Sequence, residues 1–122
     1  MVNKLLSGRR VLVIEDELLV LMMIEDMLAD LGCESVVAAA TVEKALAALD
    51  AEVIDVAMLD MNLNGDKSPA VAEALAARGI PFVYSTGDGG SNIGDGFRDR
   101  PVLRKPFRTE DLVEILTRLL SR

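Results

Sequence analysis

Five short apolar runs alternate along the chain with longer segments of helical periodicity. The runs are rich in β-branched residues and carry few polar interruptions, which is typical of strands covered on both faces of a sheet. We predict strands at residues 11–14, 35–39, 53–59, 80–84 and 102–105.

The segments between these runs carry helix start and stop signals. We expect helices over residues 17–31, from Thr41 to about Leu49, over residues 68–78, and from Thr109 to near the C-terminus. Thr41 and Thr109 suit the N-cap position, and proline after Ser68 suits the first helical position. Gly32 and Gly79 suit the residue after a helix ends. In the last helix, leucine and isoleucine recur three and four residues apart, as in a helix with one buried face.

Strict alternation of strands and helices predicts an α/β fold, a doubly wound five-stranded parallel sheet with helices on both faces. One element is exceptional, because the stretch STGDGGSNIGDG at residues 85–96 contains five glycines. We expect a loop there, with at most a short or poorly formed fourth helix. The whole chain, residues 1–122, is predicted to be one domain, with residues 1–8 as an N-terminal tail.

Composition excludes several function classes. The net charge of −7 argues against nucleic acid as the main partner, and the absence of histidine excludes histidine-dependent catalysis and histidine-bound metals. No apolar run is long enough to span a membrane, and the N-terminus does not resemble a signal peptide. A single cysteine, Cys33, cannot form an intrachain disulfide. We therefore expect a cytoplasmic protein.

The first predicted helix leaves apolar side chains on its polar side. Leu18 and Met22 fall on the same side as Glu25 and Ala29 by helical spacing. Two interpretations stay open: scattered surface apolar residues beside ordinary core packing, or an interface with a partner or a second copy. A monomer or a weak dimer is consistent with either.

Charged and hydroxyl side chains follow the predicted strands. The first strand is followed by Glu15 and Asp16, the third by Asp60, the fourth by Ser85 and Thr86, and the fifth ends in Lys105. Because the carboxyl ends of parallel strands share one edge of the sheet, these side chains are expected to meet there. A lone Asp after a strand is usually a cap or turn residue, so the prediction depends on the whole set.

This set of residues has a definite chemistry. Neighbouring carboxylates repel each other unless a cation lies between them, and Mg²⁺ prefers oxygen ligands together with phosphate oxygens. A carboxylate is also a nucleophile that can form an aspartyl phosphate. Mg²⁺, the Lys105 ammonium and the Thr86 hydroxyl would then stabilise the charge of a phosphoryl group on Asp60.

Four motifs in order resemble the response-regulator receiver domain of two-component signalling: VIEDE (13–17), MLDMNLNG (58–65), STG (85–87) and LRKPF (103–107). The resemblance covers essentially the whole chain. It implies a flavodoxin-like sheet of strand order 2-1-3-4-5, and a phosphoryl group received from a sensor histidine kinase or a histidine phosphotransfer protein. The downstream partner stays unknown.

The resemblance also implies roles for individual residues. Asp60 is the phosphoryl acceptor, Glu15 and Asp16 hold Mg²⁺ together with Asp60, and the backbone carbonyl of Asn62 completes the metal site. Thr86 supplies the switch hydroxyl and Lys105 binds the phosphate. The Lys105–Pro106 bond is expected to be cis.

The chain departs from the usual receiver pattern. Val102 occupies a position where receivers often carry an aromatic switch residue, so Tyr84 either supplies that role from the fourth strand or is simply a packed aromatic. Asp88, together with Asn62, either tunes the lifetime of the phosphoaspartate or is an exposed loop residue. The stretch YSTGDGG is similar to a glycine-rich subgroup of single-domain receivers with a Phe-Ala-Thr-Gly-type motif, which hints at stress-response signalling.

We therefore expect a stand-alone response regulator that signals by protein–protein contact or acts as a phosphate sink, and not an enzyme acting on other substrates. One alternative is a receiver-like binding module that works without phosphorylation. Another is a haloacid-dehalogenase-like phosphatase. That class typically has a second Asp where this chain has Asn62, and it needs a substrate cap for which the chain is short.

Overall fold

The computed structural model describes residues 5–61, 68–86 and 101–120. The described elements are β1 (Arg10–Ile14), α1 (Leu18–Asp30), β2 (Ser35–Ala39), α2 (Val42–Ala51), β3 (Val56–Asp60), α3 (Ser68–Ala77), β4 (Phe82–Thr86), β5 (Val102–Arg104) and α4 (Thr109–Leu120). All strand pairs are parallel, and the sheet order is β2-β1-β3-β4-β5. The predicted flavodoxin-like α/β fold is confirmed.

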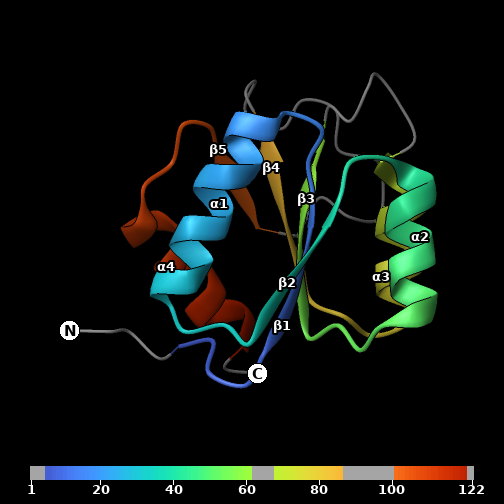
Figure 1. Ribbon diagram of the computed structural model, residues 1–122, viewed down its shortest axis with the longest axis horizontal. Helices are drawn as coiled ribbons and strands as arrows, with labels where there is room; N and C mark the ends of the chain where they lie inside the picture. The colour runs from blue at the N-terminus through green and yellow to red at the C-terminus, as the bar shows by residue number, and fades with distance from the viewer. Residues whose placement is uncertain (1–4, 62–67, 87–100, 121–122) are drawn as a thin grey trace.

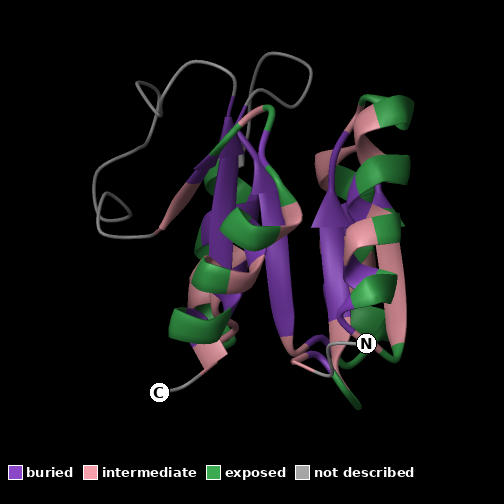
Figure 2. Ribbon diagram, turned by 90° about the vertical axis from the view of Figure 1, so that its left-hand side faces the viewer, coloured by how far each residue is buried: buried purple, intermediate pink, exposed green. Residues whose placement is uncertain are grey.

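The sheet separates two layers of helices. Helices α1 and α4 cover one face, and α2 and α3 cover the other (Figure 1). Leu12 and Ile14 belong to the core cluster on the α2/α3 side, whereas Val11 and Val13 belong to the cluster on the α1/α4 side. Successive side chains of a strand point to opposite faces, so a central strand needs apolar residues at every position. Figure 2 accordingly shows the central strands buried throughout.

Two strands lie further toward the C-terminus than the sequence predicted. β3 covers Val56–Asp60, where residues 53–59 were expected, and β4 covers Phe82–Thr86, where residues 80–84 were expected. Parallel pairing continues through the polar residues at the strand ends, because Asp60 pairs with Ser85. The fifth strand ends at Arg104, one residue before the predicted end. Asp60 and Thr86 thus belong to the sheet itself and do not follow it.

The helix ends follow their local signals with one correction. Thr41 caps α2, and its Oγ1 accepts the Lys44 N–H at 3.1 Å. Thr109 is instead the first residue of α4, and the Asp111 carboxylate accepts the Arg108 N–H at 2.9 Å. Asp111, at the third helical position, thus accepts the backbone N–H of the cap residue Arg108, as in half of a capping box. This bond stabilises the start of α4 without a threonine cap.

Glycines mark two turns as predicted. Gly32 and Gly79 follow α1 and α3 with φ angles of 82° and 69°, a left-handed conformation that glycine adopts without strain.

Part of the predicted N-terminal tail is packed on the domain. Leu6 is fully buried, and its N–H donates to Leu31 O at 3.0 Å. Ser7 forms an antiparallel bridge with Cys33. The described part of the predicted N-terminal tail thus packs on the domain, because the apolar side chain of Leu6 belongs to the core cluster on the α1/α4 side.

Several sequence predictions lie outside the described residues. Asn62, Asp88 and the glycine-rich stretch with the expected fourth helix belong to them. Among the described helices, none combines the length and the hydropathy that a membrane crossing requires.

Candidate functional site

The carboxyl edge of the sheet brings together side chains from four separate segments. Asp60 and Thr86 end β3 and β4. Glu15 directly follows β1, and its N–H donates to Ala39 O of β2 at 3.0 Å. Lys105 follows β5, and its N–H donates to Thr86 O at 2.7 Å. Backbone pairing of the sheet therefore brings these four side chains to one edge, where the sequence predicted them to meet.

Lys105 is surrounded by carboxylates. Its Nζ lies 2.9 Å from Glu15 Oε1 and 3.5 Å from Asp60 Oδ2. The side chains of Glu15 and Asp60 are only 1% and 3% exposed, whereas 18% of the Lys105 side chain is exposed. A third carboxylate, Glu17, reaches within 3.9 Å of the same Nζ from the solvent side. The single ammonium of Lys105 thus forms ion pairs with three carboxylates.

The pKa values reflect this excess of negative charge. Burial raises the pKa of the Glu15 carboxyl to about 7, and the nearby Asp60 adds to the rise. Hydrogen bonds from Lys105 and from the Glu17 N–H lower the pKa of Glu15 only part of the way. For Lys105, burial alone would lower the pKa, but the Glu15 and Asp60 carboxylates outweigh it and raise the pKa. The lysine stays charged, and the site favours a further cation.

Glu15, Asp16 and Asp60 form a suitable metal site. Each offers one carboxylate oxygen, and these oxygens lie within 4.8 Å of one another. Asp16 is half-buried beside the two buried acids. Carboxylate oxygens suit a hard divalent ion, and a partly open cluster leaves room for the waters that Mg²⁺ retains. The donor set therefore fits Mg²⁺, as predicted; the contribution of Asn62 lies outside the described residues.

The family comparison agrees with this geometry. A model of the response regulator receiver domain matches residues 11–117. The chain belongs to the response-regulator receiver family. This family is a signalling module, as expected from the sequence. No match was found among curated proteins.

Solved receiver structures give the same assignment. The solution structure of SdrG from Sphingomonas melonis Fr1 is 45% identical, with a TM-score of 0.76 over 95% of this chain and 98% of that chain. The BeF3-activated conformation of SdrG from Pseudomonas melonis Fr1 is 44% identical, with a TM-score of 0.80 over 98% and 99%.

Two more distant receivers share the fold. The PhyR stress response regulator is 26% identical, with a TM-score of 0.75 over 93% of this receiver and 45% of that chain. The receiver domain of sensor histidine kinase PA1611 from Pseudomonas aeruginosa PAO1, solved with a magnesium ion in its active site cleft, is 24% identical, with a TM-score of 0.78 over 95% and 100%.

The predicted switch residues of this receiver lie on neighbouring strands. Thr86 is fully buried. Tyr84, two residues earlier, is 3% exposed and packs edge-to-face on Phe82, with ring centroids 5.5 Å apart. Tyr84 pairs in register with Val102 of β5, so the aromatic ring on β4 stands beside the position where receivers often carry one on β5. Its packing is established, and its switch role stays a prediction.

Glu17 had no predicted role at the site, although the structure places its carboxylate near Lys105. The signal was present in the run VIEDE, where a third acid follows the acidic pair.

Helical spacing identified Leu18 and Met22 as exposed residues of α1 but missed Leu19 and Met23, which are 77% and 48% exposed. The Lys105–Pro106 bond is cis, as the resemblance implied.

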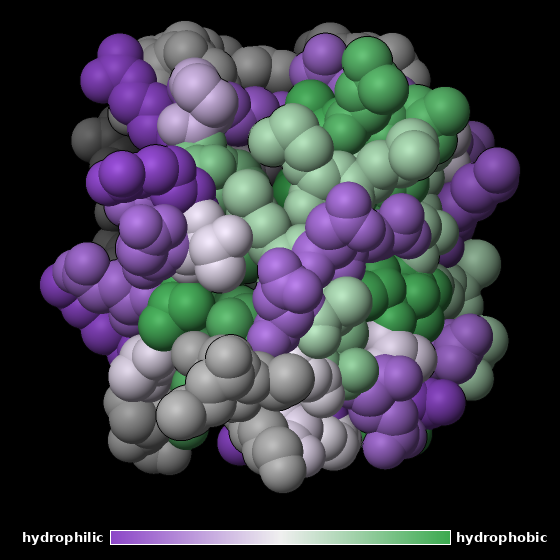
Figure 3. Space-filling view, turned by 60° about the vertical axis from the view of Figure 1, so that its left-hand side comes forward, coloured by the Kyte–Doolittle hydropathy of each residue, from purple (hydrophilic) through white to green (hydrophobic). Residues whose placement is uncertain are grey.

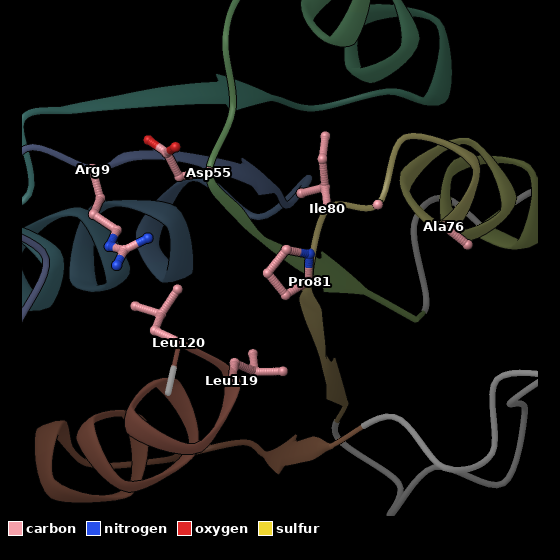
Figure 4. Close-up of a pocket in the computed structure, with 8 residues that line it drawn as sticks. Arg9, Asp55, Ala76, Ile80, Pro81, Leu119 and Leu120 are labelled. Carbon is pink, nitrogen blue, oxygen red and sulfur yellow. The ribbon is translucent and has the colours of Figure 1, made fainter. Parts of the chain in front are cut away.

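A pocket at the opposite edge of the sheet is separate from this site. It measures about 360 Å³ and is lined by Arg9, Asp55 and Pro81, which precede β1, β3 and β4, and by the end of α4 (Figure 4). The Asp55 Oδ2 accepts the Arg10 N–H at 2.7 Å. Since these residues mark the amino ends of the strands, the pocket lies away from Asp60, which ends β3 at the carboxyl edge.

Proposed function

We propose that Asp60 accepts a phosphoryl group, and that Glu15, Asp16 and Asp60 hold the Mg²⁺ that the reaction requires. The observation that carries this proposal is the position of the Lys105 ammonium between Glu15 and Asp60, at 2.9 and 3.5 Å. Two relatives support it: PA1611 holds magnesium in its active site cleft, and SdrG has a BeF3-activated conformation.

The chemistry is an in-line transfer between two nucleophiles. An Asp60 carboxylate oxygen attacks the phosphorus of a phosphohistidine on the donor protein. The O–P bond forms as the N–P bond breaks, and the departing imidazole takes a proton from water. When bound, Mg²⁺ neutralises charge on the phosphoryl oxygens. Lys105 donates to one phosphoryl oxygen, and the Thr86 hydroxyl donates to another once the group is in place.

The exposed face of α1 supports a helical phosphodonor as the partner. Leu18, Leu19, Met22 and Met23 are between 48% and 77% exposed. Figure 3, which brings the α1/α4 side forward, shows hydrophobic side chains gathered on this face. We propose that a sensor histidine kinase or a phosphotransfer protein docks here, because α1 begins directly beside the acidic site. The Lys- and Arg-free sequence of α1 favours a basic rim on that partner.

The output is proposed to be a protein–protein contact or withdrawal of phosphate from a pathway. Phosphorylation adds charge and acceptor oxygens beside Thr86 and Lys105, which shifts the population of their conformations. The similarity to SdrG, with 98% of that chain covered, supports a stand-alone regulator. We propose a cytoplasmic location for it, as expected from the sequence. The similarity to the PhyR stress response regulator supports a stress-response setting.

Mass spectrometry tests the proposal directly. Incubation with Mg²⁺ and acetyl phosphate, or with a phosphorylated kinase, should add one phosphoryl group to the protein. Asp60→Ala should not gain it, whereas Glu34→Ala, an exposed control at the amino edge of the sheet, should. No mass increase with any donor would favour the phosphorylation-independent binding module. Turnover of a generic phosphate ester would favour a phosphatase.

A further inference from the structure

We propose that Glu17 is a positioning residue whose carboxylate competes with the phosphoryl group for Lys105 and so weakens the phosphorylated state. The inference rests on the proposed function of Asp60. It assigns to a residue outside the candidate metal cluster a role in setting how firmly the receiver holds its phosphoryl group.

The contacts of Lys105 define two sides of its ammonium. Glu15 and Asp60 approach the Nζ at 2.9 and 3.5 Å, and both are buried. Glu17 approaches at 3.9 Å, and its side chain is 67% exposed. Glu17 is therefore the acid that attracts Lys105 outward, away from the buried pair.

The backbone fixes Glu17 in this position. Its N–H donates to Glu15 Oε2 at 3.1 Å, so the two residues are held together at the N-terminal end of α1. The next helical residues are anchored as well, since the Leu21 N–H donates to Glu17 O at 2.9 Å. The Glu17 side chain is 67% exposed, and its carboxylate lies 3.9 Å from the Lys105 ammonium.

Helix capping does not account for this glutamate. Glu17 is the N-cap residue of α1, with an extended backbone, yet its side chain makes no capping hydrogen bond. Serine, threonine, aspartate and asparagine are the side chains that stabilise this position well. A glutamate here contributes little to the helix, and its carboxylate is available to Lys105.

Phosphorylation changes the balance around Lys105. The phosphoryl group carries about 1.5 to 2 negative charges in place of the single charge of the Asp60 carboxylate, and it brings further acceptor oxygens beside the ammonium. The Glu17 carboxylate repels this charge and also competes for the same donor. Because Glu17 is exposed, solvent and salt screen its effect, and we expect it to be modest.

The beryllofluoride adduct, a mimic of the phosphoryl group, provides the test. With Mg²⁺ at saturation and low salt, Glu17→Gln should bind beryllofluoride about two- to fivefold more tightly than the wild type, the range expected for an exposed ion pair. The difference should shrink at about 0.5 M salt, where the Debye length falls to a few ångströms. Phosphate loss from Asp60 should slow by a similar factor.

Glu34→Gln is the matched control. Glu34 is exposed and changes the net charge equally, but it precedes β2 at the opposite edge of the sheet, where its N–H donates to Arg9 O at 2.8 Å. The affinity of the Glu34→Gln variant for beryllofluoride should equal that of the wild type. In Glu17→Gln without Mg²⁺, the side-chain NMR signal of Lys105 should also shift, which a solvated surface residue would not cause.

The outcomes separate the two proposals. If the wild type binds no beryllofluoride and gains no phosphate, the function proposed for Asp60 is wrong. If the wild type binds beryllofluoride while Glu17→Gln behaves as Glu34→Gln does, or leaves the Lys105 signal in place, only the role of Glu17 is overturned.

Discussion

Lys105 Nζ lies closer to Glu15 Oε1, at 2.9 Å, than to Asp60 Oδ2, at 3.5 Å. Glu15 is the more deeply buried of the two partners, at 1% side-chain exposure. In the unphosphorylated receiver, the lysine therefore compensates a buried carboxylate as well as facing the proposed phosphoryl acceptor. The same ammonium thus pairs with a buried acid in the folded receiver and would bind the phosphoryl group in the proposed reaction.

Replacing Lys105 with methionine should destabilise the metal-free protein. The change leaves Glu15 buried without its ion-pair partner, and we expect a loss of about 1–3 kcal/mol in the free energy of unfolding. Urea unfolding at pH 8 measures it. Adding Glu15→Gln to Lys105→Met should recover part of the loss, because the unpaired charge disappears. A single variant as stable as the wild type would show that the pair makes no net contribution.

Magnesium should stabilise the folded receiver through Glu15, Asp16 and Asp60. At a concentration about 100 times its Kd, a ligand that binds only the native state adds about 2.7 kcal/mol to the free energy of unfolding. Thermal unfolding should therefore shift upward with MgCl₂ and revert with a chelator. Asp16→Asn should reduce the shift. An equal shift with NaCl at matched ionic strength would point to general screening.

Leu19→Glu should impair phosphotransfer from a protein donor while leaving the reaction with acetyl phosphate unchanged. Leu19 is 77% exposed on the proposed docking face, and a charge there would have to be desolvated against the partner. We expect a loss of about tenfold or more in transfer rate, equivalent to about 1.4 kcal/mol.

Val53→Glu is the control for this surface. Val53 is 69% exposed but precedes β3 at the other edge of the sheet. Its transfer rate should stay at the wild-type value. Equal losses in both variants would mean that the added charge acts on the whole protein and that α1 is not the docking face.

Cys33 should react slowly with alkylating reagents, because little of its thiol is in the reactive thiolate form. Burial raises the pKa of the Cys33 thiol above its ordinary value of 9.0, so less thiolate is present at any pH below that value. The rate of iodoacetamide alkylation in the folded protein should keep rising with pH beyond 9.0, whereas the urea-unfolded chain should reach its midpoint at the ordinary thiol value. Identical midpoints would contradict this.

The sequence was sufficient for the order and type of the described elements, because β-branched runs and helix signals alternate with little ambiguity. It was less accurate for strand ends. A polar residue such as Asp60 or Thr86 looks like the end of a strand, but backbone pairing with a neighbour depends on register, which is a property of the assembled sheet. β3 and β4 therefore continue through Asp60 and Thr86, the residues predicted to belong to the site.

The sequence predicted which residues meet at the candidate site, but it did not predict which of them make the closest contacts. Strand ends identified Glu15, Asp16, Asp60, Thr86 and Lys105 together. Which carboxylate Lys105 contacts most closely depends on side-chain reach across β1, β3 and β5, and one-dimensional spacing does not encode that distance. Glu17 was missed for the same reason, because its contact with Lys105 joins residues 88 positions apart in the chain, from 17 to 105.

The order β2-β1-β3-β4-β5 has a further consequence. Asp60 lies on a central strand, and the acids and the lysine that serve it arrive from flanking strands encoded before and after it. The residues of the candidate site span the chain from Glu15 to Lys105, so a nascent chain that ends before Lys105 lacks the ammonium proposed to bind the phosphoryl group. Addition of the last strand, β5, is therefore a precondition for the proposed phosphorylation.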